Sequence, residues 1–141
     1  MSEDYSFSVR TRVAFSDTDA QGVVYYGRYL PYFDLARTEY HRELGGPRAP
    51  GTEFVMRASS VEYLAPARFD DLLEVFVRVG RIGRTSVTYE YAVYRLGPGE
   101  EEVLMVTAAQ TLVLIDHADR RTLPVPERFR ATIAAFEGTA A

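Results

Sequence analysis

Two aspartates and a glycine lie close together near the start of the chain. The stretch DTDAQG, residues 17–22, has the form D-x-D-x-x-G. Such a cluster can bind a cation, cap a helix, or place a catalytic carboxylate beside a helix. In a calcium loop beginning at Asp17, the fifth position would be Gln21 and the twelfth would be Arg28. A cationic side chain stands where that loop needs a bidentate acid, so we expect no metal site here.

The other two interpretations depend on the helix that follows the cluster. An aspartate just before a helix commonly caps it or forms a turn, and either acid could do so. A carboxylate near a helix N-terminus can also act on a carbonyl whose oxygen is held by the free backbone N–H groups there. Asp19 could attack such a carbonyl or activate water against it. Gly22 would then let the backbone approach closely, and acyl transfer would need neither a metal nor a cysteine.

The spacing of apolar residues predicts the elements that position this cluster. Apolar and polar residues alternate from Tyr5 to Phe15, which predicts a half-buried strand with Phe15 on its apolar side. After the turn the period changes to three and four, which predicts a helix that starts between Tyr26 and Tyr29 and ends at the glycines 45–46. Its polar face carries the pairs Asp34–Arg37 and Glu39–Arg42. Its apolar face comprises Tyr26, Tyr29, Phe33, Ala36, Tyr40 and Leu44.

The remainder of the chain predicts a sheet and a short final helix. Strands are expected over residues 53–66, on both sides of a turn near 80–83, and over 103–116. The length of the last strand suggests a central position, and Pro126 opens a helix over 126–136. Residues 45–53 are expected to form a loop and 97–102 a hairpin turn. This order predicts an α+β fold in which about five antiparallel strands wrap one long helix.

Composition limits the classes of function. The 141 residues are 47% hydrophobic, which favours one globular domain over residues 1–141. A net charge of −4 argues against a nucleic-acid partner, although 16 basic residues allow a local pocket for a phosphorylated ligand. The absence of cysteine excludes thiolate nucleophiles and disulfides. No signal peptide or membrane span is expected, so we predict a cytoplasmic protein.

A longer segment around the cluster makes the chemistry more specific. Residues 12–40, RVAFSDTDAQGVVYYGRYLPYFDLARTEY, resemble the signature of the 4-hydroxybenzoyl-CoA thioesterase family, notably its YbgC-like branch. Weaker matches follow in VEYLAPARFDD (61–71), RIGRTSVTYEY (81–91) and LPVPERF (123–129). The resemblance therefore extends over nearly the whole chain.

The resemblance implies the hotdog fold, a long helix wrapped by an antiparallel sheet, and hydrolysis of an acyl-CoA thioester. It implies that Asp19 is the catalytic carboxylate, as nucleophile or general base, and that the backbone N–H of Tyr26 polarises the thioester carbonyl. Many YbgC-like members have histidine at the position of Tyr26, so only the backbone role carries over. The resemblance implies no cofactor beyond the coenzyme A of the substrate.

Further residues receive roles that the sequence leaves open. Asp17 is expected to support the turn or orient Asp19. Arg84 and Ser86 follow a hairpin turn where the family often contacts CoA phosphates, although a solvated turn explains them equally well. Hotdog subunits generally pair, so a homodimer or homotetramer with shared active sites is expected. The alternative functions are a non-catalytic acyl-CoA-binding module, another hotdog enzyme such as a hydratase or dehydratase, and a purely structural or partner-binding protein.

Overall fold

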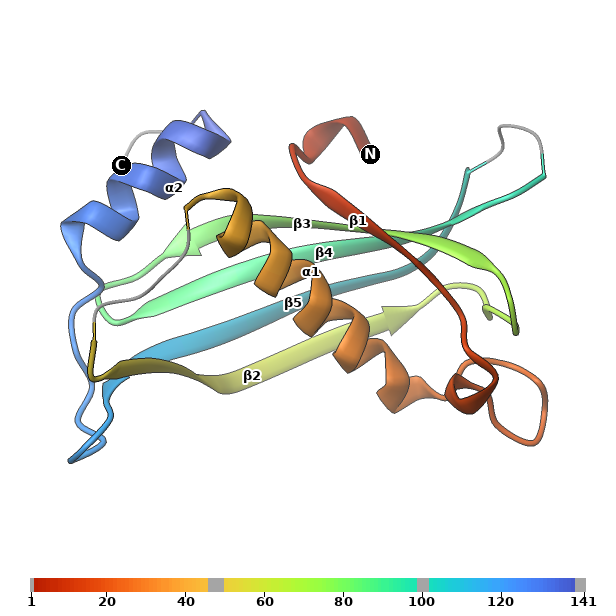
Figure 1. Ribbon diagram of the computed structural model, residues 1–141, viewed down its shortest axis with the longest axis horizontal. Helices are drawn as coiled ribbons and strands as arrows, with labels where there is room; N and C mark the ends of the chain where they lie inside the picture. Colours follow the sequence, from red (N-terminus) through yellow and green to blue (C-terminus); the bar gives the residue numbers. More distant parts are fainter. Residues whose placement is uncertain (1, 46–49, 99–101, 139–141) are drawn as a thin grey trace.

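One long helix lies against a five-stranded antiparallel sheet (Figure 1). The computed structural model describes residues 2–45, 50–98 and 102–138. In these residues the strand order is β1-β3-β4-β5-β2, and every neighbouring pair is antiparallel. This arrangement confirms the α+β class and the five strands predicted from the sequence. In chain order the elements are η1 (Ser2–Asp4), β1 (Ser8–Arg12), η2 (Phe15–Asp17), η3 (Tyr26–Arg28), α1 (Tyr29–Glu43), β2 (Thr52–Tyr63), β3 (Leu72–Ile82), β4 (Ser86–Leu96), β5 (Glu102–Asp116) and α2 (Glu127–Glu137).

The helix α1 crosses the sheet diagonally and buries an aromatic stripe against it (Figure 1). The predicted start and end of the helix are confirmed, because a 3₁₀ turn over residues 26–28 leads into α1 and Gly45 follows its last turn with a φ of 90°. Tyr26 was predicted on the apolar face but is 65% exposed, because the 3₁₀ turn precedes the regular helix. The buried residues of α1 are Tyr29, Tyr32, Phe33, Ala36 and Tyr40.

The first strand is shorter than its alternating pattern predicts. Only Ser8–Arg12 pair with β3, and Val13 then buries its side chain while its N–H donates to Asp71 O at 3.0 Å. Phe15 was predicted on the buried side, but it begins the 3₁₀ turn η2 and is 77% exposed. The paired strand ends at Arg12, and the chain then enters the 3₁₀ turn η2. The alternation of apolar and polar residues in the sequence therefore extends beyond the end of the strand.

The hairpin strands and the final helix follow the prediction closely. The turn between β3 and β4 falls at residues 83–85, and Pro126 is the N-cap of α2. The strand β5 has neighbours on both sides, but the middle strand of the sheet is β4. Part of the predicted loop, residues 46–49, and part of the hairpin turn, residues 99–101, lie outside the described residues.

Candidate active site

The loop between β1 and α1 is a narrow two-stranded ribbon. The N–H of Tyr25 donates to Asp17 O at 2.9 Å, and the N–H of Asp19 donates to Val23 O at 2.9 Å. Thr18 and Val24 form a β-bridge between these two contacts. The ribbon thus returns the chain directly into the first helical turn, and both aspartates lie in the segment alongside residues 23–25.

Gly22 makes the sharp return of this ribbon possible. Its φ is 81°, a left-handed conformation that favours glycine, and its N–H donates to Asp19 O at 2.9 Å. The sequence prediction gave Gly22 a different purpose, close approach of the backbone. That purpose concerns a bound substrate and stays a prediction; among the described residues, a Cβ at Gly22 would meet no atom within 4 Å. Backbone conformation is the requirement at this position.

Asp19 is half-buried and combines a turn contact with a free oxygen. Its Oδ1 accepts a hydrogen bond from Gln21 N–H at 2.8 Å and a longer one from Val23 N–H at 3.5 Å. These contacts form the turn that the sequence suggested for an aspartate here. Oδ2 has no hydrogen-bond partner among the described residues, so it can face a substrate. The described part of the chain contains no group of three or more acids or histidines that could hold a metal ion.

The first turn of the helix supplies backbone donors beside this loop. The N–H of Tyr25 is used by Asp17, and the N–H of Arg28 donates to Tyr25 O at 2.9 Å. The N–H groups of Tyr26 and Gly27 have no preceding helical carbonyl to reach, which is usual for the start of a helix. The carbonyl of Tyr26 accepts the Tyr63 hydroxyl at 3.1 Å, and their rings lie 4.9 Å apart. The end of β2 therefore holds this turn in place.

Asp17 is buried under the same turn and is fully paired. Only 5% of the residue is exposed. Oδ2 accepts the Ala14 N–H at 2.9 Å and the Tyr32 hydroxyl at 2.8 Å, and Oδ1 accepts two N–H groups of Arg28 at 2.9 and 3.1 Å. Burial opposes ionisation, but the hydrogen bonds from Ala14, Tyr32 and Arg28 outweigh it and hold the pKa of Asp17 below its ordinary value.

Arg28 and Tyr32 are site residues that sequence reasoning missed. Both belong to the first turns of the helix, and their spacing of four residues places them on one face. Burial and the hydrogen bond to Asp17 raise the pKa of Tyr32, which keeps its hydroxyl a donor. The sequence signal for this contact was weak: two hydrogen-bond donors, Arg28 and Tyr32, stand four residues apart and follow Asp17 in the preceding loop.

Arg84 and Ser86 lie far from Asp19 within one chain. They belong to the turn and first residue of β4, at the end of the sheet opposite the β1–α1 loop (Figure 1). The 11 residues of β3 separate the two ends, a length of roughly 35 Å. Arg84 is exposed, and the turn is held by a bond from Gly83 N–H to Ser86 O at 2.8 Å. A single chain does not bring these predicted site residues together.

Comparison with known proteins finds relatives that match most of this chain. The thioesterase superfamily profile matches residues 21–102. The acyl-CoA thioesterase YbgC of Haemophilus influenzae is 31% identical over 133 residues, which cover 91% of this chain and 94% of that protein. The acyl-CoA thioester hydrolase YbgC of Escherichia coli O6:H1 is 32% identical over 130 residues, covering 89% of this chain and 92% of that protein.

Solved structures share the fold. A variant of 4-hydroxybenzoyl-CoA thioesterase in complex with 4-hydroxybenzoyl-CoA superposes with a TM-score of 0.84 at 21% identity, covering 90% of this chain and 97% of that chain. This likeness confirms the hotdog fold that the sequence resemblance implied. The profile match and the two YbgC relatives extend over most of the sequence. The chain therefore belongs to the thioesterase superfamily.

Proposed function

We propose that the protein hydrolyses the thioester bond of an acyl-CoA, with Asp19 as its catalytic carboxylate. The observation that carries this proposal is the half-buried Asp19 with Oδ2 free, in the loop that leads into the first turn of the long helix. That turn offers the N–H groups of Tyr26 and Gly27 to a developing oxyanion. The names of the YbgC relatives support acyl-CoA as the substrate class.

Two routes are open to the Asp19 carboxylate, and both release the same products. As a nucleophile, Asp19 attacks the carbonyl carbon, the C–S bond breaks, and the departing thiolate takes a proton from water; a second water then cleaves the resulting anhydride. As a general base, Asp19 removes a proton from a water molecule that attacks the same carbon, and the C–S bond breaks with protonation of the thiolate. In both routes the oxyanion accepts a hydrogen bond from the backbone N–H of Tyr26. Neither route requires a cofactor beyond the coenzyme A of the substrate.

The test is release of free thiol from a panel of short, long and aryl acyl-CoAs. The proposal expects multiple turnovers with at least one member of the panel. Tight binding of acyl-CoA without turnover would instead support the non-catalytic acyl-CoA-binding module. Hydration of an enoyl-CoA without thiol release would support a hydratase.

We further propose that two copies pair through the edge of β2 and share their active sites. In the described sheet β2 has only one neighbour, β5, and its residues 56–60 are exposed. Antiparallel pairing about a two-fold axis places the β3–β4 turn of one copy beside the β1–α1 loop of the other. Arg84 and Ser86 of one copy would then contact CoA phosphates of a substrate bound at Asp19 of the second copy.

Mixing two impaired variants, assayed at low substrate concentration, tests this shared site. Arg84→Gln is expected to raise KM for acyl-CoA roughly tenfold, because one charge-assisted phosphate contact is lost. Asp19→Asn removes the carboxylate. A mixed dimer has one site with both residues intact, so mixing should restore activity at low substrate concentration. If the mixture shows no more activity than the sum of the separate variants, Asp19 and Arg84 do not serve one site across the dimer.

The last part of the proposal concerns the partners and the cellular location of the protein. No helix in the described residues is long and apolar enough to cross a membrane. A net charge of −4 gives no reason to expect a nucleic-acid partner. We propose the cytoplasm as its location.

A further inference from the structure

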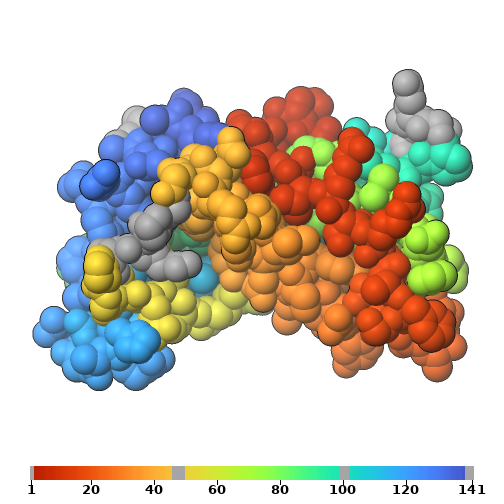
Figure 2. Space-filling model, viewed as in Figure 1, coloured from red at the N-terminus to blue at the C-terminus, as the bar shows by residue number. Residues whose placement is uncertain are grey.

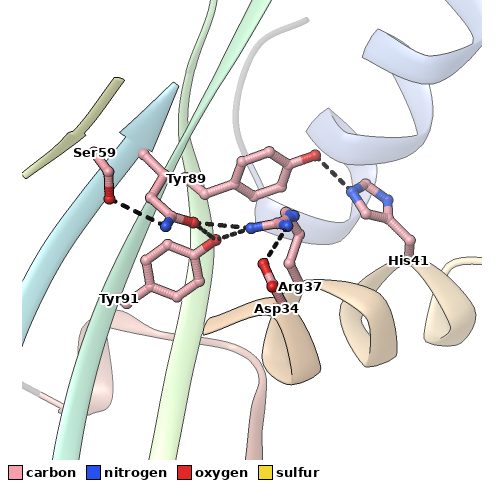
Figure 3. Close-up of polar contacts among 7 residues, drawn as sticks. Asp34, Arg37, His41, Ser59, Tyr89 and Tyr91 are labelled. Atoms are coloured by element: carbon pink, nitrogen blue, oxygen red, sulfur yellow. Dashed lines mark hydrogen bonds and ion pairs between the residues drawn. The ribbon is translucent and has the colours of Figure 1, made fainter. Parts of the chain in front are cut away.

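A buried polar cluster lies in the sheet, away from the loop that carries Asp19. Among the described residues, the buried polar or charged ones are Asp17 and Gln110 of β5, which is 2% exposed. Gln110 Oε1 accepts Arg37 Nη1–H at 2.8 Å and the Tyr91 hydroxyl at 2.9 Å (Figure 3). Burying these groups costs stability relative to an apolar core, so their presence needs a reason.

The hydrogen bonds of this cluster fix the orientation of one exposed hydroxyl. Because both donors point at Gln110 Oε1, the amide nitrogen must face the other way, and Nε2–H donates to Ser59 Oγ at 3.2 Å. Ser59 therefore accepts on the side of Gln110 and directs its own proton away from it. This series of hydrogen bonds starts at the charged guanidinium of Arg37, which polarises each hydrogen bond that follows. Ser59 is exposed and thus presents an oriented donor.

This donor lies on the strip of sheet between α1 and β2. Side chains two residues apart share a face of a strand, so Ser59 faces the same side as Val61 and Tyr63. Tyr63 contacts Tyr26 at the first helical turn, so the strip begins at the proposed catalytic site. From Tyr63 to Ser59 it extends about 13 Å along β2. Farther along β2, Figure 2 shows a hollow between the later part of α1 and the first part of β2, through which atoms of β4 and β5 are visible.

The lining of the strip changes from apolar to polar along its length. Near Tyr63 it presents Val61 and its partner Ala108 on β5. Leu30, which is 40% exposed, lies one helical turn before Asp34 on the same face of α1 and is expected to border this end. Near Ser59 it presents Arg37 and Asp34, which form an ion pair at 2.7 Å with the Asp34 side chain 59% exposed. The carboxylate of Asp34 disfavours a second anion nearby. A neutral oxygen acceptor therefore suits this end of the strip.

We propose that Ser59 determines specificity by donating a hydrogen bond to a neutral oxygen, a hydroxyl or an oxo group, on the distal part of the acyl chain. The proximal part of the chain would lie on Leu30, Val61 and Ala108. This inference rests on the proposed acyl-CoA hydrolase function and names the substrate class of that site. Pairing through the edge of β2 leaves Ser59 available, because its side chain points to the face of the sheet.

The test compares matched substrates on the wild type and two serine variants. Hexanoyl-, octanoyl- and decanoyl-CoA are assayed beside their terminally hydroxylated counterparts. The wild type should prefer the hydroxylated member at one chain length by roughly tenfold in kcat/KM. Ser59→Ala should abolish this preference by lowering kcat/KM for the hydroxylated member more than for its unsubstituted counterpart. Ser60→Ala is the matched control, since the neighbouring side chain faces the opposite side of the strand.

The outcomes separate this inference from the proposed function. Equal hydrolysis of both members of every pair, or a preference that survives in Ser59→Ala, overturns the role of Ser59 while the hydrolase function stands. A preference for terminally carboxylated acyl chains over hydroxylated ones overturns the neutral-acceptor assignment. If the wild type releases thiol from no acyl-CoA, the proposed function itself fails.

Discussion

Asp19→Asn is expected to lower kcat for thioester hydrolysis by two orders of magnitude or more. The substitution removes the charge that either attacks the carbonyl or activates water, and an amide does neither. The turn should persist, because an amide oxygen can still accept the Gln21 N–H that Asp19 Oδ1 accepts at 2.8 Å. The free energy of unfolding should therefore change by less than about 1 kcal/mol. Steady-state kinetics and urea unfolding of both proteins measure the two quantities.

Asp119→Asn provides a matched control for this experiment. Like Asp19, Asp119 is a turn aspartate whose Oδ1 accepts the N–H two residues later, here from Arg121 at 3.0 Å, and its side chain is exposed. It lies in the turn that follows β5, outside the β1–α1 loop. The control should keep wild-type kcat. Equal losses in the two variants, or an active Asp19→Asn enzyme, would show that the carboxylate of Asp19 serves only the turn.

Asp17→Asn is expected to destabilise the folded protein by about 2–4 kcal/mol. The Asp17 carboxylate accepts from Ala14, Tyr32 and Arg28 and is almost completely buried. An amide directs two of its own N–H groups at these donors, so at least one buried donor loses its partner. Arg28 stays half exposed and can turn to water, which limits the loss. Urea unfolding at neutral pH measures the difference.

The effect of Asp17→Asn should depend on pH in one direction. The folded-state pKa of Asp17 lies below its ordinary value, so ionised Asp17 stabilises the native state above the unfolded pKa of about 4. As pH falls through the folded pKa, the carboxylate is protonated and this contribution disappears. The difference in unfolding free energy between wild type and variant should therefore shrink on acidification. If the difference in unfolding free energy stays constant from neutral to strongly acidic pH, the ionised Asp17 carboxylate does not stabilise the native state through these hydrogen bonds.

Local patterns were sufficient to predict most of the elements. The change of period from two to about three and a half located α1 to within a few residues, since a helical face is a property of neighbouring positions. The glycine pair at 45–46 and Pro126 marked helix ends by their own backbone preferences. The D-x-D-x-x-G stretch was predicted to be a turn for the same reason, and it is one.

Contacts between distant segments were beyond the reach of those patterns. Arg37 was predicted on the polar face of α1, and its pair with Asp34 is confirmed. Its side chain is nevertheless mostly buried, because Tyr91 and Gln110, on two later strands, accept hydrogen bonds from its guanidinium. The burial of Asp17 likewise depends on Tyr32, fifteen residues later. Sequence spacing assigns a residue to a face but does not reveal which polar groups meet it there.

The most direct test of the catalytic site is a crystal structure of Asp19→Asn with an acyl-CoA that the wild type hydrolyses. The proposed mechanism predicts the thioester carbonyl oxygen within hydrogen-bond distance of the Tyr26 N–H, and the carbonyl carbon facing the side chain at position 19. It also predicts CoA phosphates beside Arg84 of the second copy. A thioester bound away from the first turn of the helix would contradict the assignment of this loop as the active site.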